Sequence, residues 1–200
     1  MTKPHKLDET MKQAKLLTQA EHKRVQAVID AHRYSRRNHA IFAFSYFAGL
    51  RACEIAALKV GDVFDENGQV SDTIFLAAGQ TKGDEANTLL VSKKLARTLA
   101  TYAAAYPNHV AKQDAPLFFS AKRGGFSAQT IVNLFARFYA LAGIKGASSH
   151  SGRRQFLTEL ADKGVNARVI QALARHKHLN TTMRYIDLNE NKLRNVIELI

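Results

Sequence analysis

Apolar residues recur at helical spacing along most of the chain, and this pattern predicts a mainly helical protein. Thr18 and Glu21 have the spacing of a capping box, which predicts a helix that starts there and runs to about Ala31. Residues 32–38 include three arginines and indicate a basic turn. Residues 40–50 are almost all apolar but too few to span a bilayer, so we expect a buried core helix there.

The middle of the chain predicts a small antiparallel sheet. Residues 71–77 and 87–91 have the composition of short strands. Residues 79–84 lie between them and contain the two glycines expected of a hairpin tip. The pattern then returns to helical spacing over residues 92–106, where Pro107 is expected to end the helix.

The second half of the chain predicts three further helices. A loop at 108–126 precedes a helix over 127–141, and two shorter helices are expected over 150–162 and 166–175. The last two resemble a helix-turn-helix, although short crossing helices also occur in many protein cores. The whole pattern predicts one compact α+β domain that is mainly α with a small antiparallel β-sheet.

The charge of the chain narrows the choice of partner. Its 200 residues carry a formal net charge of +12, which favours a polyanion. An anionic membrane competes with nucleic acid for this role, but the sequence shows neither a lipidation motif nor an isolated basic amphipathic helix. The single cysteine, Cys53, excludes an internal disulfide, and the N-terminus has no signal-peptide core. We therefore expect a cytoplasmic protein that binds nucleic acid and no membrane.

Arg51 directly follows the apolar run, where a charge is costly unless it has a partner. It is either a surface arginine just past a helix end or an anion clamp held rigid by the core. Glu54 lies three residues further on, where a helical turn would let its carboxylate support the guanidinium. Cys53 is expected to be a small packed side chain, because no base for it is evident.

The segment from Ser149 to Tyr185 is dense in histidine and arginine. His150 and Arg153 share one face at a helix N-terminus, where backbone N–H groups and the helix dipole favour an anion. The alternative is a capping histidine beside a solvated arginine. His150, His176 and His178 also suggest a zinc site, but no matching carboxylate cluster or cysteine pair accompanies them.

Six positions together resemble the catalytic domain of the tyrosine recombinase, or phage integrase, family. They are Arg51 in Gly-Leu-Arg-Ala-Cys-Glu, Lys82 in Thr-Lys-Gly, His150 and Arg153 in His-x-x-Arg, His176, and Tyr185 in Thr-Thr-Met-Arg-Tyr. Singly, Lys82 would be a solvated turn lysine and Tyr185 a packed tyrosine. The order of the six and the step from His176 to Tyr185 match the family over roughly residues 17–190.

The sequence departs from the family pattern at two places. The family usually has Leu-Arg-His around its second arginine, and this chain has Gly152-Arg153-Arg154. It usually has Leu-Gly-His at the late histidine, and this chain has Ala174-Arg175-His176. Neither departure removes a catalytic group, so we expect them to affect local packing and DNA contacts.

The resemblance implies a role for each residue. Arg51 and Arg153 would hold the phosphate, His150 and His176 would add hydrogen bonds or move protons, and Lys82 would be the general acid. Tyr185 would be the nucleophile that forms a 3′-phosphotyrosine on double-stranded DNA, with no cofactor and no metal required. A catalytic domain is expected over 17–188, between a flexible basic arm at 1–16 and a C-terminal helical tail at 189–200.

The remaining alternatives concern the whole protein. The tail packs either on its own domain or on a neighbouring copy, so we expect self-association as a dimer or tetramer on DNA. The chain resembles short members without a preceding helical domain, such as fimbrial phase-switch recombinases, or is a fragment of a longer protein. A non-catalytic DNA-binding regulator and a type IB topoisomerase-like enzyme are the competing functions.

Overall fold

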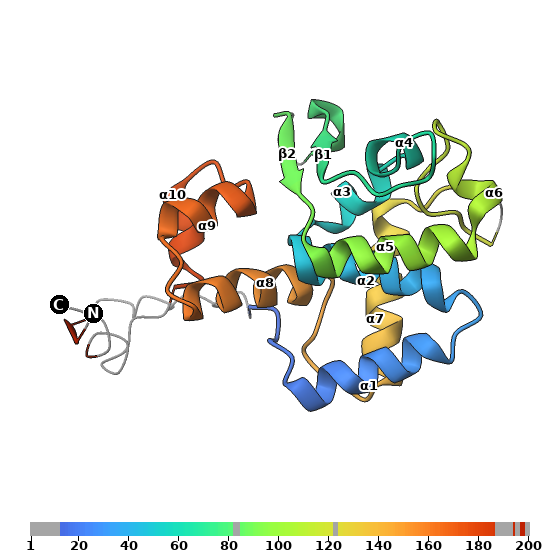
Figure 1. Ribbon diagram of the computed structural model, residues 1–200. Coiled ribbons are helices and arrows are strands. Elements are labelled where there is room, and N and C mark those ends of the chain that lie inside the picture. The colour runs from blue at the N-terminus through green and yellow to red at the C-terminus, as the bar shows by residue number, and fades with distance from the viewer. Residues whose placement is uncertain (1–12, 82–84, 122–123, 187–193, 195–196, 199–200) are drawn as a thin grey trace, which may run out of the picture.

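The computed structural model describes residues 13–81, 85–121, 124–186, 194 and 197–198. Within these residues the chain forms helices around one two-stranded sheet, which confirms the predicted α+β class (Figure 1). The helices are α1 (Gln19–Asp30), α2 (Ser35–Ala48), α3 (Ala52–Ala57), α4 (Val60–Val63), α5 (Lys93–Ala105), α6 (Pro107–Val110), α7 (Ala128–Leu141), α8 (Ser151–Asp162), α9 (Ala167–Ala174) and α10 (Leu179–Met183). A 3₁₀ turn, η1 (Ala78–Gln80), follows strand β1 (Thr73–Leu76), which pairs with β2 (Asn87–Leu90).

The predicted capping box starts α1. The Glu21 backbone N–H donates to Thr18 Oγ1 at 3.2 Å, and Glu21 Oε2 accepts from the Thr18 backbone N–H at 3.0 Å. These bonds satisfy N–H groups that a helix start otherwise leaves without partners. Serines at 92 and 127 cap α5 and α7 in a similar way, so these helix starts agree with the sequence.

The basic turn predicted at 32–38 is wrong in its second half, because α2 begins at Ser35. Arg37 is buried inside this helix, and its guanidinium carbon lies 4.4 Å from the ring centre of Tyr34 and 4.9 Å from that of Phe126. Its Nη1 donates to the Phe119 carbonyl at 2.8 Å. The aromatic rings offset the burial of the charge, and the ring of Phe126 comes from a distant segment that a local pattern cannot reveal.

One hydrophobic core fills most of the molecule. Residues 40–48 of α2 are almost entirely buried, as the apolar run predicted, and α2 contacts α1, α5 and α8. Tyr102 of α5 and Phe135 of α7 are among the largest fully buried side chains. This body supports the short helix α3 and the β-hairpin, which stand on one side of it in Figure 1.

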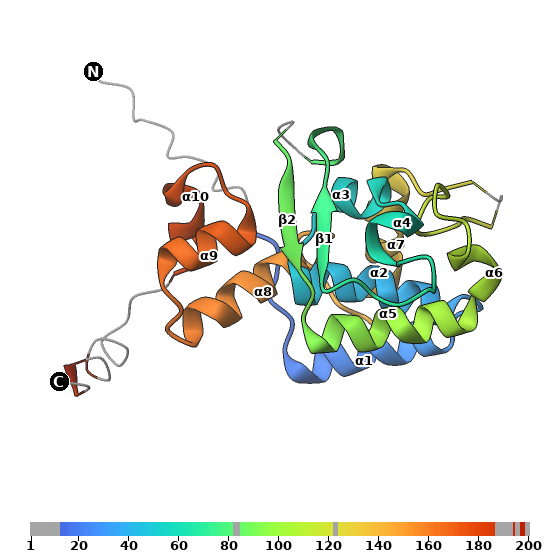
Figure 2. The ribbon, with the colours of Figure 1, turned by 45° about the horizontal axis from the view of Figure 1, so that its top comes forward.

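A second, smaller core lies beyond the first turns of α8. Leu157, Ala161, Ile170 and Ala174 are buried there, and Tyr185 packs against them. Figures 1 and 2 both show α9 and α10 at one end of the molecule, joined to the body through α8. We call residues 157–186 the C-terminal module.

The sheet is the predicted hairpin with slightly shorter strands. Thr73 pairs with Leu90 and Leu76 with Asn87. Alternation places Ile74 on the core side, where it is buried. Residues 82–84 of the predicted tip lie outside the described part of the chain.

Both predicted terminal segments lie largely outside the described residues. Of the arm at 1–16, residues 1–12 are not described; Lys15 N–H donates to the Gly146 carbonyl at 3.1 Å, and Arg154 Nη1 donates to the Ala14 carbonyl. Of the tail at 189–200, the structure describes residues 194, 197 and 198. None of the helices in the described ranges combines the length and apolarity needed to cross a bilayer.

Candidate active site

The turn between α2 and α3 is the centre of the candidate site. Gly49 ends α2 in the left-handed conformation with φ of 61°. A Cβ atom at this position would lie 2.7 Å from Cδ1 of Phe156, so glycine is required by both backbone angle and space. The turn brings the Gly49 carbonyl close to α8 and to the end of α9, where arginine side chains reach it.

Arg51 lies just past the end of the buried helix, as expected, and is the N-cap of α3. Its Nη1 is 2.7 Å from Glu54 Oε1, while Glu54 Oε2 accepts the Arg51 backbone N–H at 2.8 Å. Glu54 is buried, whereas 21% of the Arg51 side chain is exposed. The expected support of Arg51 by Glu54 is present, and part of the Arg51 side chain remains exposed.

Arg153 is buried in the first turn of α8. Its Nη1 donates to the Gly49 carbonyl and its Nη2 to the Ala174 carbonyl, so one guanidinium links the ends of α2 and α9. Burial, and then the positive charges of Arg51 and Arg175, lower the pKa of Arg153 to about 9. The group remains charged at neutral pH, in a strongly positive environment.

His176 and Tyr185 lie against each other in the C-terminal module. Their ring centres are 5.9 Å apart with 18° between the ring planes. His176 Nδ1 lies 2.9 Å from Thr182 Oγ1, and the Tyr185 backbone N–H donates to the Thr182 carbonyl. Burial, followed by the charges of Arg153, Arg51 and Arg175, lowers the pKa of His176 to about 4. The imidazole is therefore neutral at pH 7 and available for hydrogen bonding.

The other two predicted residues have different positions. His150 is exposed at the N-cap of α8, three residues before buried Arg153. Lys82 lies outside the described residues. Its neighbour Thr81 donates from Oγ1 to the Glu85 carbonyl at 2.8 Å, and this contact brings the two flanks of the tip together.

Sequence reasoning missed Arg175, which appeared only as a departure from the glycine usual before the late histidine. It caps α9 with φ of 55° and is the one non-glycine residue of positive φ in the described chain. That angle explains why glycine is common at this position. The available signal was the arginine in place of the usual glycine, and its left-handed angle and its contacts became visible only in the structure.

A cavity of about 310 Å³ lies between α3, the flanks of the hairpin tip and the α9–α10 connection. Its lining includes Arg51, Arg175, His176, Lys177 and Thr181. Lys177 Nζ and Glu85 Oε1 form an ion pair of 3.1 Å between the two sides. Glu54 and Glu85 also line the cavity, so its three cations, from Arg51, Arg175 and Lys177, exceed its carboxylates by one, which suits an anion such as a phosphate diester. Arg153, His150 and Tyr185 are not among the lining residues.

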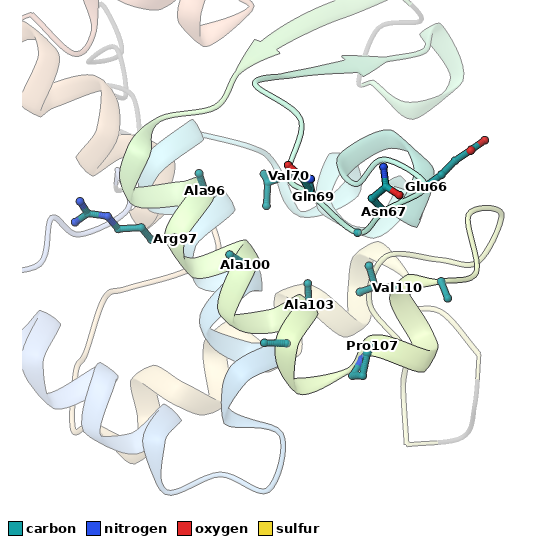
Figure 3. Close-up of a pocket in the computed structure, with 13 residues that line it drawn as sticks. Glu66, Asn67, Gln69, Val70, Ala96, Arg97, Ala100, Ala103, Pro107 and Val110 are labelled. Atoms are coloured by element: carbon teal, nitrogen blue, oxygen red, sulfur yellow. The ribbon is translucent and has the colours of Figure 1, made fainter.

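A larger cavity, about 700 Å³, lies between α5 and the turn after α4 (Figure 3). Alanines 96, 100 and 103 on α5 form one wall, and the turn at 66–69 forms the other. None of the candidate residues lines it. The zinc alternative gains no support either, since no metal-binding group of three or more His, Cys, Asp or Glu occurs in the described ranges.

The departure at Gly152 has a packing reason. A Cβ atom there would lie 2.6 Å from Cδ2 of Tyr46 and would also clash with Ser45 Oγ. The aromatic ring of Tyr46 occupies the space that a leucine side chain at 152 would need. The same close approach of α8 to α2 places Arg153 beside Gly49.

Comparison with known proteins identifies the family of this chain. The model of the Phage integrase family matches residues 15–192. The chain is 30% identical over 188 residues to tyrosine recombinase XerA of Pyrococcus horikoshii, which covers 92% of this chain and 60% of that protein. It is 29% identical over 201 residues to tyrosine recombinase XerD of Neisseria meningitidis serogroup A, with 99% and 66% covered.

Solved structures agree in fold. A crystal structure of XerA recombinase superposes with a TM-score of 0.73 at 26% identity, covering 92% of this chain and 64% of that one. The Tn1549 transposon integrase in complex with transposon right end DNA has a TM-score of 0.75 at 16% identity, covering 97% and 68%. At that identity the likeness shows the fold alone. The chain spans about half to two thirds of the length of the curated relatives it matches.

Proposed function

Since the chain belongs to the phage integrase family of tyrosine recombinases, we propose that it is a site-specific recombinase or integrase that cuts and rejoins double-stranded DNA. One observation carries the proposal. Arg51 and Arg153 lie beside the turn at Gly49, and His176 and Tyr185, from a separate segment, are close enough to interact electrostatically with these arginines. Two guanidiniums, a neutral imidazole and a phenol are the groups that transfer of a phosphodiester to tyrosine requires.

The arginines would stabilise the charge that develops on phosphorus during attack. Arg51 offers its exposed portion to the nonbridging oxygens, and Arg153 keeps three of its five N–H groups beyond the two carbonyl bonds. Glu54 fixes the orientation of Arg51, so little reorganisation is needed when the phosphate binds. His150, at the exposed start of α8, would add a hydrogen bond from the same side as Arg153.

The reaction conserves the phosphodiester energy. Tyr185 Oη forms a bond to the phosphorus at a DNA 3′ end while the bond to the 5′ oxygen breaks. The phenol proton passes to a histidine, His176 or His150, and Lys82 delivers a proton to the leaving 5′ oxygen. The 5′ hydroxyl of a second strand then attacks the phosphotyrosine and releases Tyr185, so strands are exchanged without ATP or metal.

The partners follow from this chemistry. The net charge of +12 favours DNA binding, and exchange between two duplexes calls for several copies of the protein on DNA. We propose self-association on DNA through the C-terminal tail, and activity in the cytoplasm.

Tyr185→Phe provides the decisive experiment. The wild-type protein is incubated with nicked duplexes tiled across the DNA flanking its gene, because a nick beside the scissile phosphate traps the covalent adduct. We expect a denaturation-resistant adduct with the wild type and none with Tyr185→Phe, although DNA binding by the variant is retained. The matched control, Tyr106→Phe, removes a hydroxyl far from the site and should keep the adduct.

Three results would contradict the proposal. An adduct that persists in Tyr185→Phe would show that another residue is the nucleophile. A wild-type protein that binds these duplexes and forms no adduct would favour the non-catalytic regulator. Relaxation of supercoiled DNA by the monomer without site preference would favour the topoisomerase-like alternative.

A further inference from the structure

Arg175 occupies a position that is unfavourable for an arginine. Its φ of 55° is in the left-handed region, which favours glycine. Its side chain is nevertheless buried, with only 3% of it exposed to solvent. A buried charge in a left-handed residue requires strong compensating contacts, and those of Arg175 include Glu54 and the Gly49 carbonyl at the candidate site.

The guanidinium of Arg175 reaches from the C-terminal module to the body. Its Nη2 lies 3.6 Å from Glu54 Oε2, 3.3 Å from the Gly49 carbonyl oxygen and 3.4 Å from that of Ala48. Its Nη1 donates to the Leu173 carbonyl within the module. Its Nε is buried without a hydrogen-bond partner, and the residue lines the cationic cavity.

Arg175 shares one acceptor with each of the two phosphate-binding arginines. Glu54 holds Arg51 through Oε1 and faces Arg175 through Oε2. The Gly49 carbonyl accepts from both Arg153 and Arg175. Movement of Arg175 would therefore alter the hydrogen bonding of both Arg51 and Arg153.

From this geometry we infer that Arg175 is a positioning residue, which ties the module carrying His176 and Tyr185 to Glu54 and Gly49. It thereby sets the placement of the nucleophile relative to Arg51 and Arg153. This inference rests on the proposed function, because placement matters only if Tyr185 attacks a phosphate held by those arginines. Arg175 directly precedes His176 in the chain, so the position of Arg175 directly constrains that of His176.

Charge supports a role in the reaction beyond simple packing. Three guanidiniums, from Arg51, Arg153 and Arg175, surround one buried carboxylate, Glu54. A purely structural ion pair would need one cation for that carboxylate. The surplus positive charge beside the cavity is stabilising once a phosphate enters.

Arg175→Gly is the main test, with Arg175→Lys beside it. Glycine suits the left-handed angle, so the variant is expected to fold, while lysine keeps the charge and loses the planar fork. Single-turnover cleavage of the nicked duplex is measured at saturating DNA. We expect the rate of Arg175→Gly to fall about 100-fold, the size of effect that a misplaced reacting group produces, and Arg175→Lys to recover little of it.

A double-mutant cycle with Glu54→Gln distinguishes positioning from a general structural effect. If Arg175 acts through Glu54, the Arg175→Gly and Glu54→Gln double variant cleaves no more slowly than the slower single variant. In the matched control, Arg97→Ala, at an exposed arginine on α5, should leave the cleavage rate unchanged both alone and together with Glu54→Gln.

Hydrogen exchange tests the tie in the free protein, without DNA. Amides of residues 176–186 should exchange at least about tenfold faster in Arg175→Gly, while amides buried in α2 and α5 keep their wild-type rates. Unchanged exchange at 176–186 would overturn the inference whether or not the protein cleaves DNA.

The outcomes separate the two proposals. If the wild type forms no adduct, the proposed function is rejected. Hydrogen exchange alone then tests whether Arg175 holds the C-terminal module to the body. An active wild type with Arg175→Gly within twofold of its rate rejects the inference and leaves the function intact. Multiplicative effects of Arg175→Gly and Glu54→Gln also reject it.

Discussion

The charge state of His176 depends on residues far away in the chain. Burial is the main cause that lowers the pKa of its ring, and the guanidiniums of Arg153, Arg51 and Arg175 lower that pKa further. The resulting pKa of about 4 is below the usual 6.5, so the folded protein binds a proton at His176 less readily than the unfolded chain does. Burial thus keeps the imidazole neutral, with help from Arg51 and Arg153, the two arginines that are proposed to hold the phosphate.

This shift predicts how stability depends on pH. Between about pH 6.5 and 4 the unfolded state binds the extra proton, so the contribution of His176 to the free energy of unfolding is lost as the pH falls through this window. His176→Gln should remove that part of the dependence, measured by urea unfolding from pH 4 to 7. His22 and His32 also have lowered pKa values, so the relevant quantity is the difference between wild type and variant. Parallel curves for the two proteins would contradict the shift.

At the scale of single residues, contacts between near neighbours in the chain could be predicted, whereas burial and long-range contacts could not. The sequence correctly places Glu54 beside Arg51, because a three-residue step on a helix brings side chains together. It gives no indication that Arg153 is buried and His150 exposed, since both lie at the same helix start. It also hides Arg175, because the left-handed angle and the distance to Glu54 belong to the folded chain.

The contact between α2 and α8 depends on the missing side chain of Gly152. An alanine there would increase helix propensity, but its Cβ would lie 2.6 Å from Tyr46 Cδ2 in a closely packed region. We expect Gly152→Ala to lower the free energy of unfolding by roughly 1–3 kcal/mol, as overpacked cores do. Chemical denaturation measures this effect.

Gly79→Ala is the control for that experiment. A Cβ atom at Gly79 meets nothing within 4 Å, so its replacement should change the free energy of unfolding by less than about 0.5 kcal/mol. Equal effects at Gly79 and Gly152 would mean that α8 can move away from α2 at little cost.

Longer elements could be predicted because their signals are local. The helix caps at Thr18, Ser92 and Ser127 each involve residues within one turn of the helix start, and the apolar run of α2 is continuous in the sequence. The short helices α3, α4, α6 and α10 were not predicted, since four to six residues contain too little periodicity. Their positions follow from the body on which they pack.

At the scale of the molecule, the site joins two unequal cores. Arg51 belongs to the larger body, and Tyr185 packs on the smaller core of the C-terminal module. The order of the six family positions predicted that such residues would come together. The sequence could not show that two cores are involved, because the division arises where the first turns of α8 pack on α2 and its later turns on α9.

The cationic cavity predicts which face of the molecule meets DNA. Affinity for a duplex should fall steeply with salt, and each lost phosphate contact should reduce the slope of log K against log salt by about 0.9. We expect Lys177→Gln, at the cavity, to reduce this slope by that amount in a Tyr185→Phe background, measured by fluorescence anisotropy. Exposed Lys112, beyond α6, is the matched control, and Lys112→Gln should leave the slope unchanged. Equal slopes for the two variants would place the DNA elsewhere.

The oxygen shared by Arg153 and Arg175 belongs to the main chain of Gly49. No side-chain replacement can delete that acceptor, so the point where both arginines converge is shielded from ordinary point mutation. A mutation can affect this acceptor only indirectly, by replacing Arg153 or Arg175 or by forcing the turn at Gly49 out of its left-handed conformation. Sequences that diverge widely around this site can therefore keep the same anchoring point, which their alignments would not reveal.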